Sequence, residues 1–282
     1  MSFNLLSVDL EDWYHFMGDP GAPAYEQWPA YESRVEKTTD VLLDILEGKR
    51  ITFFVLGYIA KQHPELIRKI ASAGHEIACH GDKHDFVFKQ GPDKFRDDIA
   101  SAKAVLEDIT GVRCSGYRAP GFSIREQDRW ALEIIKEEGF EYDSSIFPAM
   151  RTSGGIAGFY PYPQKINLKS GQLVELPVST SKVLGVTTAF CGGGFFRFFP
   201  ESYIVNGIKK INAIGQPAIT YIHPRDLDYD QPKLPLKPVN RFMFYFGLKK
   251  AQAKFKRLVG GYEWGAFDDF VRRSNSLPVT EF

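Results

Sequence analysis

The sequence has no excess of charge of either sign. Its 282 residues include 35 lysines and arginines and 35 aspartates and glutamates, so it offers no basic face to nucleic acid, which is excluded as a partner. No apolar run approaches the ~20 residues of a membrane-spanning helix. The N-terminus reaches Asp9 too early for the basic start and apolar core of a signal peptide. We therefore expect a soluble, cytoplasmic protein.

Cysteine is scarce, and the common nucleotide-binding motifs are missing. Cys79, Cys114 and Cys191 are odd in number and lack paired metal-ligand spacing, so they are predicted to be reduced packing residues. No Gly-x-Gly-x-x-Gly motif follows the first predicted strand, and there is no phosphate-binding loop of the Gly-Lys-Ser/Thr type. Both observations count against a dinucleotide or nucleoside triphosphate site.

Helix and strand patterns alternate along most of the chain. Apolar residues with helical spacing, bounded by glycine or proline, predict helices over about 34–48, 64–74, 92–111, 123–139 and 201–215. Short apolar, β-branched or aromatic runs predict seven strands, over 3–9, 51–56, 76–80, 113–118, 140–145, 172–178 and 217–223. This alternation predicts an α/β fold of parallel βα units, arranged as an open sheet or as a closed barrel.

The pattern changes from about Tyr229 onward. A proline-rich strap over 231–238 leads into a segment, 239–273, that mixes aromatic and basic residues. We expect residues 1–228 to form the α/β unit. Residues 229–282 are expected to be an extension packed on it, within the same structural unit, because a barrel of this length commonly folds as one domain.

Candidate catalytic groups follow five of the predicted strands. His80 and His84 lie four residues apart, a spacing at which two imidazoles can bind one metal ion. Because the carboxyl ends of parallel strands meet at one edge, all five sets are expected there. They are Asp9 with Glu11 and Asp12, His80 with His84, Arg118, Asp143, and His223.

These residue types suit metal-assisted hydrolysis. Two imidazoles and a carboxylate would hold a divalent ion, an arginine would hold a second carboxylate as a base, and a further histidine would protonate a leaving group. Taken singly, each group has a structural alternative: a surface acidic turn around Asp9, an Arg118 that ties two loops together, and a core histidine at His223.

The order and spacing of these residues resemble the polysaccharide deacetylase superfamily, carbohydrate esterase family 4, over roughly residues 3–228. An acidic first motif, a His-x-x-x-His motif, an Arg-x-Pro motif, an aspartate and a late histidine match at 9–12, 80–84, 118–120, 143 and 223. Further segments resemble a bacterial subgroup associated with cell-surface polysaccharide and exopolysaccharide biosynthesis. These are residues 9–13, 52–57, 192–197 and 223–224.

The resemblance implies a distorted (β/α)7 barrel that removes an N-acetyl group from an amino sugar in a surface polysaccharide or its precursor. It implies Asp9 as the base held by Arg118, and His223 as the acid oriented by Asp143. Zinc is the metal expected, although cobalt, nickel or iron would also fit. The implied metal ligands are His80, His84 and either Glu11 or Asp12. The expected substrate contacts are Trp13, Gly121, Phe122 and Phe195.

The chain departs from the family pattern at two places. The family has adjacent aspartates where this chain has Asp9 followed by Leu10. Strand alternation favours Glu11 as the ligand, whereas a turn at Leu10 would present Asp12. Gly81 replaces a serine or threonine whose hydroxyl steadies the loop. A cyclic amidohydrolase of the allantoinase type and a non-catalytic sugar-binding barrel are the alternative functions, and the oligomeric state is left open.

Overall fold

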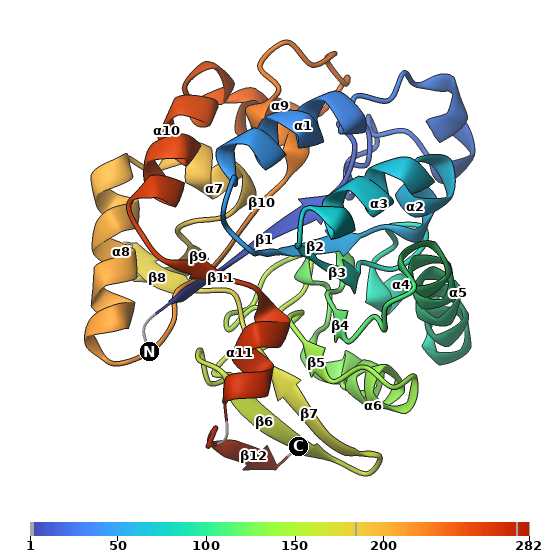
Figure 1. Ribbon diagram of the computed structural model, residues 1–282, viewed down its shortest axis with the longest axis vertical. Helices are drawn as coiled ribbons and strands as arrows, with labels where there is room; N and C mark the ends of the chain where they lie inside the picture. The colour runs from blue at the N-terminus through green and yellow to red at the C-terminus, as the bar shows by residue number, and fades with distance from the viewer. Residues whose placement is uncertain (1–2, 184, 275, 282) are drawn as a thin grey trace.

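A mostly parallel sheet forms the centre of the molecule, and helices surround it (Figure 1). The computed structural model describes residues 3–183, 185–274 and 276–281. The main sheet has the strand order β10-β1-β2-β3-β4-β5-β7-β6-β12. The predicted strands correspond to β1 (Asn4–Leu10), β2 (Thr52–Val55), β3 (Glu76–Cys79), β4 (Gly116–Tyr117), β5 (Tyr142–Asp143), β7 (Gly171–Glu175) and β10 (Ile219–Ile222). The expected α/β fold is thereby confirmed.

The central strands are apolar runs because both of their faces are covered. All seven residues of β1 and all four of β2 are buried, as expected for parallel strands between packed layers. Helix residues complete the core on the outer side of the sheet. Among them are Leu42, Ile67, Ile99, Leu106, Ile135 and Ile208.

The sheet has an irregular seam between β7 and β10. Within the described residues no strand ladder joins these two strands. Instead, the Ser179 N–H donates to the Ile219 carbonyl (3.0 Å), and the Ile219 N–H donates to the Ser179 hydroxyl (2.8 Å). The segment that follows β7 therefore links the two ends of the parallel strand series.

The five predicted helices are present, and further short ones join them. They are α1 (Val35–Ile45), α3 (Pro64–Ser72), α5 (Pro92–Thr110), α6 (Trp130–Glu137) and α8 (Glu201–Ala213). Short segments add η1 (Tyr25–Ala30), α2 (Gly57–Gln62), α4 (Val87–Gln90), η2 (Pro120–Phe122), η3 (Glu126–Asp128), α7 (Gly193–Phe198) and η4 (Pro224–Leu227).

Helix α6 begins later than the sequence predicts. Arg125 has extended backbone angles (φ −110°, ψ 173°), and only the short segment η3 separates it from α6. The Ser123 hydroxyl accepts a hydrogen bond from the Val87 N–H (3.0 Å). The loop after β4 is therefore shaped by its contacts at the edge of the sheet.

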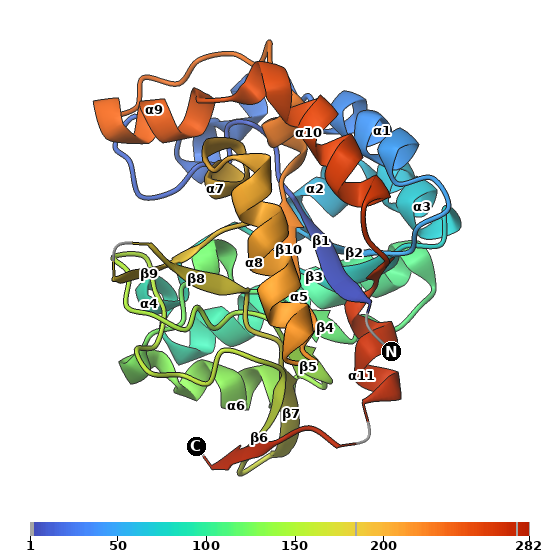
Figure 2. The ribbon, with the colours of Figure 1, turned by 90° about the vertical axis from the view of Figure 1, so that its left-hand side faces the viewer.

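Two hairpins and the C-terminal region complete the structure. The hairpins are β6 (Gln164–Leu168) with β7, and β8 (Thr180–Val183) with β9 (Val186–Ala189). The C-terminal elements are α9 (Pro238–Tyr245), α10 (Leu248–Gly260), β11 (Trp264–Gly265), α11 (Phe267–Arg273) and β12 (Val279–Glu281). Figure 2 shows α9 and α10 at one end of the molecule and β12 at the other. The division of the chain at residue 228 stays a prediction.

The C-terminal region is attached to the sheet at several points. Strand β11 pairs with β1, and β12 pairs with β6. At the start of α11 the Phe267 N–H donates to the Thr52 hydroxyl (2.8 Å), and the Asp268 N–H donates to the Glu76 carboxylate (3.1 Å). The Tyr142 hydroxyl also donates to Glu76 (2.8 Å). A buried carboxylate thus anchors the start of α11.

Candidate metal and catalytic site

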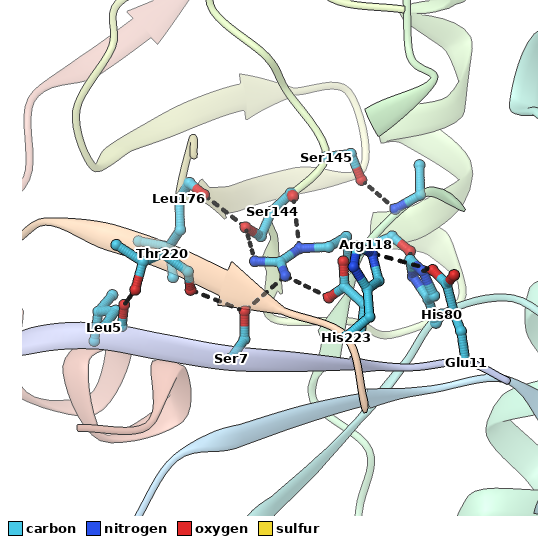
Figure 3. A network of polar contacts seen from close by, with 12 residues as sticks. Leu5, Ser7, Glu11, His80, Arg118, Ser144, Ser145, Leu176, Thr220 and His223 are labelled. Atoms are coloured by element: carbon cyan, nitrogen blue, oxygen red, sulfur yellow. Dashed lines mark hydrogen bonds and ion pairs between the residues drawn. The ribbon is translucent and has the colours of Figure 1, made fainter. Parts of the chain in front are cut away.

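Arg118 lies directly after β4, and Figure 3 shows its guanidinium beside Ser7 and Ser144; the same group binds Asp9. Its guanidinium donates to Asp9 Oδ1 (2.6 Å), to the Ser7 hydroxyl (2.7 Å), and to the carbonyl and hydroxyl of Ser144 (3.2 and 2.9 Å). Its Cζ also lies 4.0 Å from the centroid of the Phe54 ring. Both charged side chains are buried, so each compensates the other.

Glu11 and two histidines converge beside this pair. Glu11 Oε1 lies 3.3 Å from His80 Nε2 and 3.0 Å from His84 Nε2, and all three residues are buried. His80 Nδ1 lies 2.7 Å from the Arg118 carbonyl, which can only accept, so Nδ1 carries a proton. In neutral His80 the lone pair on Nε2 therefore faces a carboxylate oxygen. An unprotonated Nε2 would repel this oxygen, so the contact needs a proton or a metal cation between the two atoms, and the donor set fits a divalent metal ion.

The environment of Glu11 keeps it ionised. Burial alone would raise the pKa of its carboxyl, but His84, His223 and His80 together lower this pKa well below the usual range. His223 Nε2 lies 3.7 Å from Glu11 Oε1. Asp9, Glu11 and His223 also offer ligand atoms within 4.8 Å of one another.

Asp226, and not Asp143, is the carboxylate that contacts His223. The η4 turn brings Asp226 Oδ2 to 2.9 Å from His223 Nδ1 and to 3.0 Å from the His223 N–H. Asp143 instead accepts hydrogen bonds from the hydroxyl and N–H of Ser145 (2.5 and 3.2 Å). The Ser145 hydroxyl accepts from the Ala119 N–H (2.8 Å), so Asp143 supports the loop that carries Arg118.

Asp226 is itself held by a buried cation. Arg197 Nε donates to Asp226 Oδ1 at 2.8 Å. Burial would raise the pKa of Asp226, but Arg197 and His223 lower it far below the usual range. For His223, burial would lower the pKa, but Glu11 and Asp226 raise it overall. The arrangement favours a protonated His223 that keeps a fixed orientation.

Asp12 and Trp13 lie outside the cluster, which corrects two predictions. Asp12 accepts hydrogen bonds from the Ser33 hydroxyl (2.5 Å) and the Arg34 N–H (3.0 Å), and so connects β1 to the start of α1. Trp13 is buried and donates from Nε1 to the Glu32 carbonyl (3.0 Å). Both side chains make local contacts away from the cluster, because the chain turns directly after β1.

The loop between the two histidines is steadied from α5. Gly81 has a φ of 76°, and a Cβ there would come within 2.8 Å of Asp98 Oδ2. The Asp98 carboxylate accepts hydrogen bonds from the N–H groups of Asp82 (2.9 Å) and Lys83 (3.2 Å). Asp98 therefore fixes the loop that, in the family pattern, depends on a hydroxyl at position 81.

A cleft of about 360 Å³ opens onto Asp9, Glu11, His84 and His223. Gly121, Phe122 and Phe195, which the sequence predicts as substrate contacts, line its wall. Several other lining residues were not predicted. They are His15, Phe16, Met17, Arg151, Arg197, Arg225, Asn240, Met243 and Phe244.

His15 is the missed residue nearest the histidine pair. Its ring centroid lies 6.3 Å from that of His84. Its Nδ1 accepts a hydrogen bond from the Asp12 N–H (3.1 Å), and its buried Nε2 has no partner among the described residues. Burial, with His84 nearby, lowers the pKa of His15 well below the usual range, so its imidazole is neutral and can donate a hydrogen bond into the cleft.

The sequence also did not predict Asp226 as the partner of His223. The feature that could have indicated it is its position three residues after His223, in a turn that begins with Pro224.

Comparison with known proteins shows similarity to described families over parts of the chain. Residues 26–142 match the polysaccharide deacetylase model, and residues 144–272 match a domain of unknown function, DUF3473. A peptidoglycan-N-acetylglucosamine deacetylase of Bacillus cereus is 32% identical over 98 residues, covering 34% of this chain and 36% of that protein. The peptidoglycan-N-acetylmuramic acid deacetylase PdaA of Bacillus subtilis is 32% identical over 105 residues, covering 36% of this chain and 39% of that protein.

The matched segments thus span little more than a third of these two relatives. A crystal structure from Mycobacterium smegmatis, provisionally described as a polysaccharide deacetylase, shares the fold with a TM-score of 0.62 at 21% identity, covering 99% of this chain and 94% of that one. Residues 26–142 of this chain are thus similar to the polysaccharide deacetylase family, and the named deacetylases match over part of their length.

Proposed function

We propose that the protein is a metal-dependent hydrolase that removes an N-acetyl group from an amino sugar of a surface polysaccharide or its precursor. The observation that carries this proposal is the convergence of Glu11, His80 and His84 on one point beside the Asp9–Arg118 pair. The matching family model and the deacetylase relatives support the reaction type. The surface-polysaccharide assignment rests on the subgroup resemblance described above.

His80, His84 and Glu11 would hold the metal ion, for which zinc is our choice given two imidazoles and a carboxylate. When bound, such an ion polarises a carbonyl group and lowers the pKa of a coordinated water. Asp12 plays no part in this proposal, because its oxygens bind Ser33 and Arg34.

The chain's own residues would move the protons. Asp9, held by Arg118, takes a proton from the attacking water as the new C–O bond forms. His223, oriented by Asp226, gives its proton to the amide nitrogen as the C–N bond breaks, leaving acetate and a free amino sugar. Gly121 lies in the cleft wall, where its N–H is the proposed donor to the acetyl oxygen in the transition state.

We also propose a reducing compartment, the cytoplasm, as the site of action. Cys79, Cys114 and Cys191 are all buried free thiols. Burial raises the pKa of each of these thiols, which keeps them protonated and unreactive. Within the described ranges, no helix has both the length and the apolar character to cross a bilayer.

An acetate-release assay tests the proposal. Chitooligosaccharides, peptidoglycan fragments and UDP-N-acetylglucosamine are supplied alongside allantoin, with protein purified without chelator and its metal content measured. We expect acetate from at least one N-acetylated sugar and about one metal ion per chain. Ring opening of allantoin alone would refute the deacetylase assignment. Metal content and turnover that survive replacement of His80 and His84 by alanine would refute the site.

A further inference from the structure

A buried arginine that makes no ion pair with any described residue lies in the wall of the cleft. Arg225 is only 9% exposed, and its Nη1 has no hydrogen-bond partner among the described residues. Its Cζ lies 4.0 Å from the centroid of the Phe244 ring, which orients the guanidinium but offers no hydrogen-bond acceptor to Nη1. A buried cation with unused donors is costly unless a ligand compensates it.

The acidic groups of the cleft are already used by other residues. Arg118 binds Asp9, and Arg197 binds Asp226 while also donating to the carbonyls of Met243 (2.9 Å) and Phe246 (2.5 Å). Glu11 faces the histidines. The guanidinium of Arg225 is therefore available to bind a ligand that enters the cleft.

A second guanidinium lines the same cleft. Arg151 lies over the Phe147 ring, with Cζ 4.6 Å from its centroid, and no ion pair joins it to any residue within the described ranges. Thr152 and Ser153 add hydroxyl groups to this wall. The cleft therefore joins the hydrolytic residues to two guanidinium groups that make no ion pair within the described ranges.

We propose that the cleft binds sugars that carry an anionic group, either a phosphate ester or a carboxylate, with Arg225 as its main ligand and Arg151 as a second one. The inference rests on the proposed deacetylase function and narrows its substrate class. A guanidinium can bind the paired oxygens of either anion through two parallel hydrogen bonds. A neutral sugar would leave both arginines without a partner.

Kinetics with three substrates test this subsite: neutral N,N′-diacetylchitobiose, N-acetylmuramic acid with its carboxylate, and UDP-N-acetylglucosamine with its phosphates. The wild-type protein should favour one of the two anionic sugars, which identifies the source of the charge. Arg225→Met keeps the aliphatic stem over Phe244, and should raise KM for that sugar roughly 10- to 100-fold while leaving kcat nearly unchanged. Arg225→Lys should recover part of the loss.

Exposed Arg113, changed to Met, is the control for a general loss of positive charge. If Arg225→Met raised KM equally for the neutral and anionic sugars, or left KM for the anionic sugar unchanged, the proposal would be overturned.

Calorimetric titration with inorganic phosphate separates the anion subsite from the proposed deacetylase function. If the wild type binds phosphate, Arg225→Met does not, and no sugar is turned over, the anion subsite is supported and the deacetylase function is refuted. If the neutral sugar is turned over and Arg225→Met changes nothing, the deacetylase function is supported and the anion subsite is refuted.

A separate observation concerns the surface around α9 and does not depend on the proposed function. Residues 231–262 contain eight lysines and arginines and no aspartate or glutamate. Two of the eight are used internally, because Lys254 donates to the carbonyls of Phe196 and Phe199 and Arg257 pairs with Glu201. The others are exposed, and none has an ion-pair partner in the part of the chain that the structure describes. They are Lys233, Lys237, Arg241, Lys249, Lys250 and Lys256.

Exposed aromatic rings lie beside two of these cations, since Phe242 and Phe246 line one surface hollow with Lys233 and Arg241. Phe242, Phe246 and Phe198 are 52%, 40% and 46% exposed, although apolar rings of this size are usually buried. The Phe246 centroid lies 5.0 Å from that of Phe242 and 5.7 Å from that of Phe198, so the three form one cluster. We call these rings and the six exposed basic residues the α9 surface. Figure 2 shows α9 at one end of the molecule, and the same helix lines the cleft through Asn240, Met243 and Phe244.

We infer that the α9 surface docks on a membrane rich in anionic phospholipids. Basic side chains around exposed aromatic rings match the headgroup region, where the cations meet lipid phosphates and the rings enter the boundary of the acyl chains. A second copy of this chain fits less well, since a two-fold contact would place these cations opposite one another. Docking would hold the cleft close to substrates anchored in the bilayer.

Sedimentation with vesicles tests docking. The protein should bind phosphatidylcholine vesicles that contain phosphatidylglycerol and be released by salt. The triple variant Lys233→Gln, Arg241→Gln, Lys249→Gln should bind on the order of 100-fold more weakly, at about fivefold per residue. The matched control is Lys94→Gln, Lys209→Gln, Lys210→Gln, three exposed lysines outside the α9 surface, and it should bind as the wild type does.

Phe242→Ser with Phe246→Ser should also weaken binding to these vesicles. The inference would be overturned if vesicle binding did not depend on phosphatidylglycerol, or if the triple variant and its matched lysine control weakened binding equally. Self-association that the two Phe replacements abolish, without any vesicle binding, would assign the α9 surface to a second copy instead.

Discussion

Glu11 and Asp12 are adjacent carboxylates, yet they should respond in opposite ways to the same conservative change. Glu11→Gln removes the one acidic group between His80 and His84. Asp12→Asn alters a carboxylate that binds Ser33 and Arg34 and faces no histidine of the cluster. The first change should therefore affect metal binding, and the second should affect folding.

The magnitudes follow from the contacts. Structural zinc sites bind with about 10–16 kcal/mol shared among four ligands, so losing one should cost about 3 kcal/mol, or more than ~100-fold in the metal Kd. Asp12→Asn directs an amide N–H₂ at donors that previously met a carboxylate oxygen. An unsatisfied buried donor costs about 1–3 kcal/mol, which should appear as a lower free energy of unfolding.

Competition titration with a chelating zinc indicator measures the first effect, and urea unfolding of the metal-free protein measures the second. Glu11→Gln should bind zinc more than ~100-fold more weakly than the wild type. Asp12→Asn should keep the metal Kd within a few-fold of wild type. Weakened zinc binding in Asp12→Asn, with normal binding in Glu11→Gln, would refute the ligand assignment.

Three further predictions concern the residues around the cluster. Asp226→Asn should lower kcat by at least tenfold and lower the pKa of His223 in NMR titrations of the metal-free protein, because the imidazolium loses its carboxylate partner; an unchanged titration would contradict this role. Arg118→Met should cost about 3–5 kcal/mol in urea unfolding, since Asp9 becomes an uncompensated buried charge, and Asp9→Asn in the same chain should recover much of the loss. Burial, together with Asp268, raises the pKa of Glu76 to about 7. The folded state then binds this proton more tightly than the unfolded state, so the free energy of unfolding should fall by about 3 kcal/mol from about pH 4.5 to pH 7, and Glu76→Gln should flatten this dependence.

The sequence was informative where local pattern determines position. Strand periodicity and the placing of candidate groups at strand ends anticipated that the acidic motif at 9–12, His80 with His84, and Arg118 would lie at one edge of the sheet. Parallel strands bring their carboxyl ends to one edge whatever the loops do, so these residues needed no tertiary detail. The same argument could not decide whether Glu11 or Asp12 faces the histidines, because the direction of the turn after β1 depends on the contact of Asp12 with the start of α1.

The sequence was less informative where loops and the C-terminal region approach the cleft. Asp143 and Asp226 both neighbour strand ends, and only the η4 turn selects Asp226 as the partner of His223. Arg225 and Asn240 reach the cleft through packing between segments distant in the chain, which no periodicity reveals. Trp13 looked like a platform for a sugar, but it packs against Tyr14 and Tyr31.

The pairing of β1 with β10 determines the order in which the site can form during protein synthesis. The Ser7 hydroxyl donates to the Thr220 carbonyl, 213 positions further along the chain. At 5–20 residues per second, the ribosome takes roughly 10–40 s to add that stretch, and one edge of β1 stays unpaired meanwhile. Glu11, His80 and His84 all emerge early, whereas His223 and Asp226 emerge with β10. In a nascent chain the proposed metal ligands can therefore come together well before the proposed acid, His223, and its partner Asp226 have been synthesised.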